Sequence, residues 1–252
     1  MTRFVRPVVI LAGLLAIWQA IVWLTGAPDY ILPGPAEVAA RLWSDAALLL
    51  FHAAVTATEI LLGLVLGAVL GAAAALFVVQ VRPARQWVLP VLVVSQAIPV
   101  FALAPLLVLW LGYGMGSKIA MATLIIFFPV TASFYDGLRR TEPGWLDLAQ
   151  TMGASRLAML RHIRLPAALP ALASGLRVAA AVAPIGAVVG EWVGAARGLG
   201  FLMLQANARL QTDLMFAALF VLAIFAVALY FTLDGVLRRA VPWQSESLES
   251  RG

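Results

Sequence analysis

Long apolar runs, separated by short charged or Gly- and Pro-rich segments, constrain the fold of this chain more than any other feature. The runs cover residues 8–23, 52–80, 87–111, 119–134, 170–192 and 214–233. Roughly 20 apolar residues allow an α-helix to cross the hydrocarbon core of a bilayer. Because lipid offers no hydrogen-bond partners, a spanning segment must satisfy its own backbone. The sequence therefore predicts an all-α, polytopic membrane protein with six transmembrane helices.

Composition agrees with this prediction and limits what else the chain can do. Hydrophobic residues make up 63% of the chain, charged residues 12%, and the mean hydropathy is +0.98, far from soluble averages. The sequence has no GKS or GKT phosphate loop and no cysteine, so we expect no ATP site, disulfide or thiolate metal site. We predict no catalytic residue, no cofactor and no metal.

The basic residues indicate how the chain is oriented. The net charge of the chain, +5, would suggest nucleic acid in a soluble protein. In a membrane protein arginines gather in cytoplasmic loops, and we expect no nucleic acid partner. Twelve of the 17 Lys and Arg residues fall on one side when both termini are placed in the cytoplasm. These are Arg3, Arg6, Arg82, Arg85, Arg139, Arg140, Arg156, Arg161, Arg164, Arg238, Arg239 and Arg251. Arg41, Lys118, Arg197 and Arg209 fall outside, and Arg177 lies within a span.

The predicted organisation is one membrane domain over residues 1–252. The first span covers 6–25; a cleaved signal peptide is the alternative, but no convincing small-residue cleavage site follows it. Residues 26–52 form an extended segment and an interfacial helix over 36–50 at the outer face. Residues 53–239 hold the core spans and a cytoplasmic loop at 139–166, and 240–252 is a tail. Between the last two spans, 193–213 is predicted to be an outer loop.

Two spans have special composition. Gly63, Gly67 and Gly71 recur every four residues, which lets another helix approach closely, within this subunit or a dimer. The run at 87–111 contains three prolines, which kink or break a helix. Interrupted helices often line pathways. Pathway candidates are Ser95, Gln96 and Pro99 from this run, and Glu191 near the outer end of 170–192; a structural kink or a membrane-edge acid is the alternative for each.

The segment from Asp147 to Pro166 is the longest that cannot lie in a membrane, and we predict two short helices in it. Thr141 is a suitable N-cap and Pro143 suits a first helical turn. Gly153 permits the positive φ that ends a helix. Ser155 then caps a second helix, which Pro166 ends. An apolar stripe with a basic rim predicts a docking element; an ordinary amphipathic loop is the alternative.

This segment resembles the loop that defines ABC-importer permeases, in which a Glu-Ala-Ala triplet is followed at fixed spacings by Gly, Ile and Leu-Pro. Asp147, Leu148 and Ala149 take the triplet positions, two of them departing from the pattern. The docking residues that the resemblance implies are Asp147, Leu148, Ala149, Met152, Gly153, Ile163, Leu165 and Pro166. In that family the loop inserts into a cleft on a cytoplasmic ATPase subunit.

The resemblance covers most of the chain, and it implies a type I ABC-importer permease fold in a bacterial inner membrane. It also implies two ATPase subunits that bind the ATP, a substrate-binding protein outside, a second permease copy in a homodimer, and lipid around them. The chain itself would be a transport subunit and no enzyme. An ion-coupled secondary transporter or a membrane-embedded hydrolase is disfavoured, because the few acids and histidines lie near span ends and are scattered.

The C-terminal third, from Gly190 to Phe231, is similar to permeases that import pyrimidine precursors of thiamine, a branch of the nitrate, sulfonate and taurine group. The resemblance implies a hydroxymethylpyrimidine-type solute. Import of a sulfonate, taurine or nitrate is the alternative, and no residue discriminates the two on physical grounds.

Overall fold

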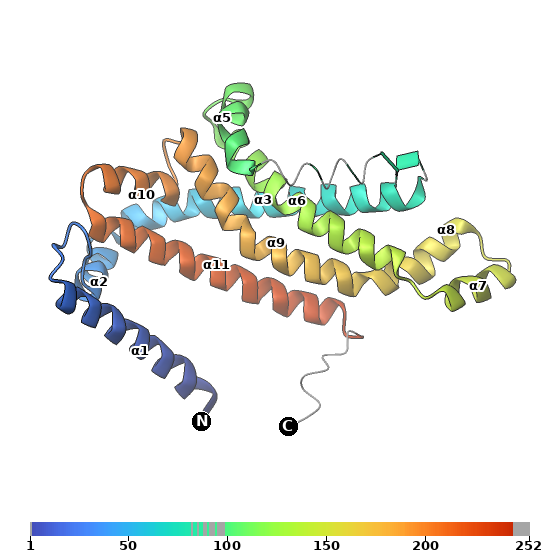
Figure 1. Cartoon of the computed structure of the whole chain (residues 1–252), viewed down its shortest axis with the longest axis horizontal. Helices are drawn as coiled ribbons and strands as arrows, with labels where there is room; N and C mark the ends of the chain where they lie inside the picture. The colour runs from blue at the N-terminus through green and yellow to red at the C-terminus, as the bar shows by residue number, and fades with distance from the viewer. Residues whose placement is uncertain are drawn as a thin grey trace.

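The computed structural model describes residues 2–81, 83, 84, 86, 87, 90, 94 and 99–243, and for residues 2–8 only the backbone. Every regular element in this part of the chain is a helix (Figure 1), which confirms the all-α prediction. The elements are α1 (Thr2–Thr25), α2 (Pro35–Ser44), α3 (Ala46–Gln80), α5 (Val100–Leu111), α6 (Met115–Arg139), α7 (Pro143–Thr151), α8 (Arg156–Met159), η1 (Leu160–Arg164, a π-helix), α9 (Leu165–Gly194), α10 (Leu199–Ala208) and α11 (Thr212–Ala240).

Four described helices are long and apolar enough to cross a membrane. They are α3, α6, the continuous helix Arg156–Gly194, and α11. The first predicted span corresponds to α1, and the third is described only in part, from α5. The count of six spans and the cytoplasmic placement of both termini stay predictions.

The four long helices run along the long axis of the molecule, so its two ends carry different elements (Figure 1). α6 packs against α3 and against α9, and α11 packs against α9. α2 and α10 lie at one end, which we call the α10 end, and α7 and α8 lie at the other, which we call the α7 end. By the predicted orientation the α7 end is cytoplasmic.

The glycine stripe of α3 packs against α6 of the same subunit. A Cβ added to Gly63 would lie 2.5 Å from the Cβ of Ala122, and one added to Gly67 would lie 2.6 Å from Cγ2 of Ile126. At Gly71 the added atom would lie 2.9 Å from a backbone oxygen, that of Phe127. Because side chains cannot enter such spaces, these glycines set the separation of the two helices.

Replacing Gly67 with Val is expected to lower the thermal unfolding midpoint of the detergent-solubilised protein. The added atoms overlap Ile126, and overpacking a fixed helix contact costs about 1–3 kcal/mol. Gly235→Val in α11 is the matched control, since a Cβ there meets nothing within 4 Å. Equal midpoints for the two variants would contradict the close packing of α3 on α6.

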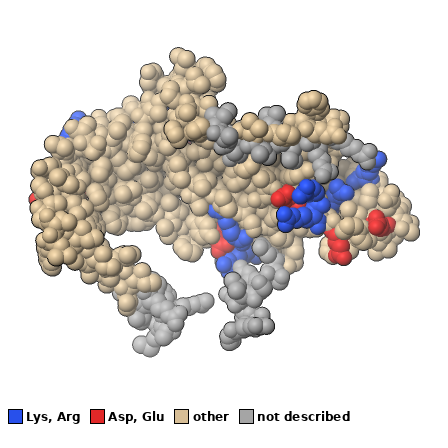
Figure 2. Space-filling model, in the orientation of Figure 1, with Lys and Arg blue, Asp and Glu red and all other residues tan. Residues whose placement is uncertain are grey.

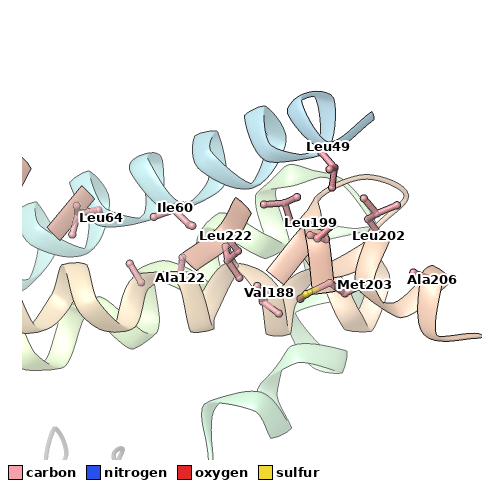
Figure 3. Close-up of a cluster of buried hydrophobic side chains, with 14 of the residues drawn as sticks. Leu49, Ile60, Leu64, Ala122, Val188, Leu199, Leu202, Met203, Ala206 and Leu222 are labelled. Atoms are coloured by element: carbon pink, nitrogen blue, oxygen red, sulfur yellow. The ribbon is translucent and has the colours of Figure 1, made fainter. Parts of the chain in front are cut away.

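The prediction of an outer loop at 193–213 is wrong in part, because this segment contains a helix. The helix packs into a hydrophobic cluster at the α10 end (Figure 3). Residues 199–208 form α10, whose buried Leu199, Leu202, Met203 and Ala206 follow helical spacing. They pack with side chains from α3, α9 and α11. The glycines and arginines around this segment suggested a loop, but its apolar face needs burial.

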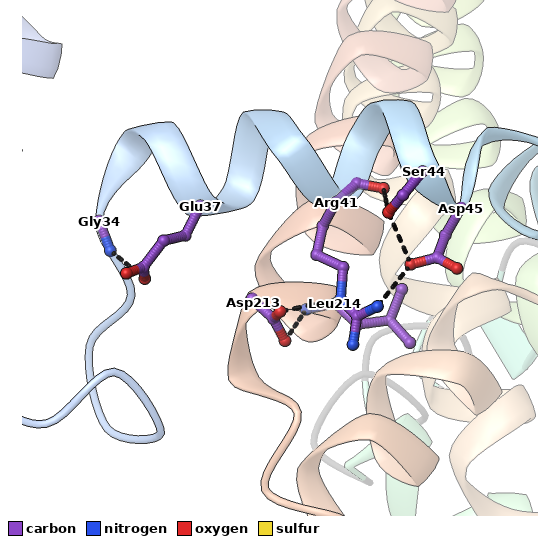
Figure 4. Close-up of polar contacts among 7 residues, drawn as sticks. All are labelled: Gly34, Glu37, Arg41, Ser44, Asp45, Asp213 and Leu214. Atoms are coloured by element: carbon purple, nitrogen blue, oxygen red, sulfur yellow. Dashed lines mark hydrogen bonds and ion pairs between the residues drawn. The ribbon is translucent and has the colours of Figure 1, made fainter.

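The predicted interfacial helix at 36–50 is divided at Asp45, whose φ and ψ are −105° and 21°. α2 therefore ends at Ser44 and α3 begins at Ala46. Asp45 accepts from the guanidinium of Arg41 at 3.0 Å, and the same guanidinium donates to Asp213 at 2.8 Å (Figure 4). This pair of ionic contacts ties α2 to the first turn of α11.

The predicted break in the proline-rich run is confirmed at Pro99. It precedes the first residue of α5 with φ −58° and ψ 116°, which is extended rather than helical backbone. Pro105 lies inside α5. Ser95 and Gln96 lie outside the described residues, so their roles in the pathway stay predictions.

Candidate functional site

The helical hairpin at the α7 end consists of α7, the bend after it, α8 and η1. Its first turn contains the predicted proline. Pro143 occupies the first turn of α7, as expected of a residue with fixed φ and no N–H. The N-cap position belongs to Glu142, however, and not to Thr141. The prediction for Thr141 was wrong because its hydroxyl donates backwards to the carbonyl of Leu138 at 3.2 Å, which closes the end of α6.

The bend and the second helix also follow prediction. Gly153 has φ +78°, and the next amide, of Ala154, donates to the carbonyl of Ala149 at 2.9 Å. Ser155 is the N-cap of α8, where its Oγ accepts from the amide of Ala158 at 3.2 Å. The chain therefore reverses between α7 and α8 through one glycine and one serine cap.

Pro166 does not end the second helix, and this prediction is corrected. α8, η1 and α9 form one continuous helix of 39 residues, Arg156–Gly194. In η1 the amide of Leu165 donates to the carbonyl of Leu160, five residues back. The widened turn shifts the hydrogen-bond register, so that Pro166, which lacks an N–H, lies in the first turn of α9. The hairpin is thus rigidly joined to a membrane span.

The hairpin forms one wall of an apolar groove of about 600 Å³, which we call the docking groove. Its lining residues are Trp145, Leu148, Ala149, Met152, His162, Ile163, Pro166, Ala167 and Trp243. Five of the eight predicted docking residues are among them. Leu148 is 62% exposed and Met152 79%. Apolar side chains this exposed outside the spans mark an interaction surface.

The other three predicted docking residues do not line this groove. Asp147 and Gly153 are exposed. Leu165 is partly buried against the cluster that joins α3, α6 and α9 near the α7 end. A second groove, of about 630 Å³, lies between the end of α3 and the hairpin, and Arg156 and Arg164 line it. Basic side chains gather over this end on the face shown in Figure 2.

The predicted pathway residue Glu191 lies inside the subunit at the α10 end, with 1% exposure. One carboxylate oxygen accepts from the hydroxyl of Thr56 at 2.6 Å, and the other accepts from the amides of Gly200 at 2.5 Å and Phe201 at 3.2 Å. Two further bonds secure the same turn: the amide of Leu199 donates to Thr56, and that of Gly198 to His52. In this arrangement Glu191 anchors the start of α10; its role in a pathway stays a prediction.

Two more charged residues are buried near Glu191. Lys118, one of the basic residues predicted to fall outside, lies in α6 with 1% exposure. Its ammonium group donates to the carbonyls of Tyr113, at 2.7 Å, and Gly194. Glu59 of α3 is 2% exposed and lies beside Glu191. Glu59 and Glu191 lie inside apolar runs and Lys118 directly precedes one. This was the sequence signal for the cluster, because intramembrane charges are rare and usually paired.

An ionic contact joins α9 to α11 in the C-terminal part of α11. Arg177, which the sequence places within a span, donates to Asp234 at 2.6 Å. Asp234 also accepts from Arg238 at 2.9 Å. Both carboxylate oxygens of Asp234 are therefore used, and the side chains of Arg177 and Asp234 are only 18% and 14% exposed.

Comparison with known proteins gives a family match over most of the chain. Residues 63–245 match the family described as "Binding-protein-dependent transport system inner membrane component". A "Probable ABC transporter permease protein" from Haemophilus influenzae is 56% identical over 95% of this chain and 98% of its own length.

Several relatives carry a solute in their names. The formylaminopyrimidine transport permease protein ThiX from Halalkalibacterium halodurans is 35% identical over 96% of both chains. The riboflavin transport system permease protein RibX from Chloroflexus aurantiacus is 40% identical over 92% of this chain and 87% of its own.

A solved structure shares the fold. A chain from the inward-facing conformations of the MetNI methionine ABC transporter superposes with a TM-score of 0.67 and 22% identity, over 79% of this chain and 98% of that one.

Proposed function

Because this chain belongs to the family of binding-protein-dependent transport system inner membrane components, we propose that it is the permease subunit of an ABC importer driven by a cytoplasmic ATPase. The single observation that supports the ATPase partner is the exposed apolar docking groove on a hairpin continuous with a membrane span. The chain is a multi-pass protein of a bacterial inner membrane.

The geometry suits transmission of movement. The helix Arg156–Gly194 has 39 residues, and at 1.5 Å per residue it is about 58 Å long. An ATPase that displaces the hairpin moves this helix as a unit, because the junction at Pro166 contains no flexible linker. A rigid element of this kind supports alternating access of a central pathway to the two sides of the membrane.

The complete importer in this proposal contains two ATPase subunits, two copies of this chain, and a binding protein that delivers the solute at the α10 end. The solute pathway lies between the two copies. The proposed contacts of the solute pathway stay Ser95, Gln96, Pro99 and Glu191. Glu191 would act by fixing the turn at the start of α10.

Replacing Leu148 with Asp is expected to abolish co-purification of the ATPase subunit and solute uptake while leaving the permease folded. Leu148 is 62% exposed, so its loss costs little stability, but a charge in an apolar contact must be desolvated. Binding is expected to weaken by about a hundredfold, typical of loss of an interface hot spot. The measurement is ATPase retention on the immobilised permease in detergent.

Gln150→Asp is the matched control, because Gln150 lies on the same helix but lines the second groove. It should retain the ATPase. If Leu148→Asp retained it equally, the docking groove would not be the ATPase contact.

For the solute we propose a pyrimidine precursor of thiamine of the hydroxymethylpyrimidine type. Two facts support this: the similarity to ThiX covers nearly the whole chain, and riboflavin, in the name of the other relative, also contains a pyrimidine ring. A sulfonate, taurine or nitrate is the alternative. The described spans have few exposed polar side chains, so selectivity would rest mainly with the binding protein.

Titration of the cognate binding protein by calorimetry is expected to show binding to aminopyrimidines, with Kd in the micromolar range or tighter, and none to taurine, alkanesulfonates or nitrate. Uptake of the same solute by vesicles containing the assembled importer checks that this chain conducts it. Sulfonate or nitrate binding would replace the pyrimidine with the alternative solute and leave the ATPase-coupled mechanism in place.

A further inference from the structure

We infer that Trp243, which follows the last membrane helix, is a contact residue for the ATPase subunit, so that the docking surface is built from two separate parts of the chain. This inference rests on the proposed function. The inference also goes beyond the proposed function, because the docking loop predicted from the sequence ends at Pro166 and Trp243 lies in the predicted tail, 240–252.

The position of Trp243 is well defined by its neighbours. α11 ends at Ala240, and the amide of Val241 donates to the carbonyl of Leu237 at 3.0 Å. Val241 is 6% exposed, so the chain leaves the helix against packed side chains. Trp243, two residues on, lines the docking groove together with Trp145 and Met152.

The exposure of Trp243 indicates that a partner protein buries this side chain. Its side chain is 56% exposed and that of Trp145, also in the groove, is 53% exposed. Tryptophan is enriched at the energetic centres of protein interfaces, where a partner buries it. Eight of the nine lining residues of the groove are apolar, with His162 the exception. A partner element that fills this groove with apolar side chains would therefore touch both tryptophans.

Tryptophans also anchor spans at the membrane surface, which is the competing role for Trp243. The shared groove favours the partner: Trp243 lies with Leu148 and Met152, which belong to the hairpin beyond the spans. A tryptophan that only anchors the chain in lipid is not expected to line the docking groove together with residues of α7.

The two-part surface has a mechanical consequence. Leu148 belongs to the hairpin joined to α9, whereas Trp243 follows α11. The contact between Arg177 and Asp234 at 2.6 Å already joins these two spans. An ATPase that holds both Leu148 and Trp243 would therefore displace α9 and α11 together.

The chain has no cysteine, so one introduced cysteine gives a unique cross-linking position. We would prepare Trp243→Cys, Leu148→Cys and Trp43→Cys, label each with a benzophenone maleimide, assemble the importer with its ATPase subunit, and irradiate it. Trp43 is the matched control: it is a tryptophan, 89% exposed, in α2 at the α10 end. Trp243→Cys and Leu148→Cys should cross-link to the ATPase, and Trp43→Cys should not.

The outcomes separate the inference from the proposed function. Cross-linking from Leu148→Cys but not from Trp243→Cys would overturn the role of Trp243 and leave the docking groove in place. Cross-linking from neither would overturn the ATPase contact itself. If Trp243→Cys is not obtained folded, the exposed neighbour Pro242→Cys carries the same probe. As a second measurement, Trp243→Ala should lower ATPase affinity about tenfold or more, whereas Trp43→Ala should not change it.

Discussion

Replacing Gly198 with Ala is expected to prevent stable folding of the α10 end and to remove most of the folded permease from the membrane. Gly198 has φ +114°, and an added Cβ would overlap the carboxylate of Glu191. To make room, Glu191 would have to leave the amides of Gly200 and Phe201. Backbone strain and unsatisfied buried groups together cost on the order of 3–5 kcal/mol, a large part of typical protein stability.

The measurement is the yield of monodisperse protein in detergent and its thermal unfolding midpoint. Gly112→Ala is the matched control: it also has positive φ, +78°, but a Cβ there meets nothing within 4 Å. It should lose only the strain of the left-handed backbone, about 1–3 kcal/mol. If the two variants lost the same stability, the overlap with Glu191 would not be the cause.

Replacing Gly153 with Val is expected to uncouple ATP hydrolysis from transport, with uptake reduced about tenfold or more while the permease stays folded. A Cβ at Gly153 meets nothing within 4 Å, so packing is not disturbed. The φ of +78° is instead unfavourable for a β-branched residue. The hairpin should then open at its bend, and Leu148 and Met152 would no longer face the same groove as Ile163.

Two variants isolate this cause. Gly153→Asn should retain uptake, because Asn tolerates positive φ better than other residues with a side chain. Gly144→Val tests added bulk in α7 without positive φ, since a Cβ there also meets nothing within 4 Å. The measurement is solute uptake and ATPase rate in the same proteoliposomes. Normal uptake by Gly153→Val would show that the bend is not needed for coupling.

Local signals predicted the elements that depend on local chemistry. Long apolar runs predicted α3, α9 and α11, and the turn chemistry of Gly153 and Ser155 predicted the hairpin. The wrong local predictions came from residues that are compatible with more than one backbone structure. A proline usually ends the preceding helix, but a π-turn accommodated Pro166. Glycines at 194, 198 and 200 suggested a loop, but they flank and begin α10.

Contacts between distant segments were beyond prediction from one sequence. Thr56 and Glu191 are 135 residues apart, and Arg177 and Asp234 are 57 apart. Each residue alone appears as a charge or hydroxyl within or directly beside an apolar run, and only the packing of α3, α6, α9 and α11 brings partners together. The same is true of Trp243, which has no periodic pattern around it and joins the docking groove only through the direction in which α11 ends.

The helix Arg156–Gly194 begins in the docking hairpin and ends, three residues after Glu191, at the anchor of α10. In an α-helix each residue turns the chain by about 100°. One residue inserted anywhere in α9 before Glu191 would therefore rotate that carboxylate away from Thr56, even though the span would lengthen by only about 1.5 Å. The docking hairpin and the anchor of α10 are thus linked by the rotation of this helix about its axis as well as by its length. The span must therefore keep the same number of residues.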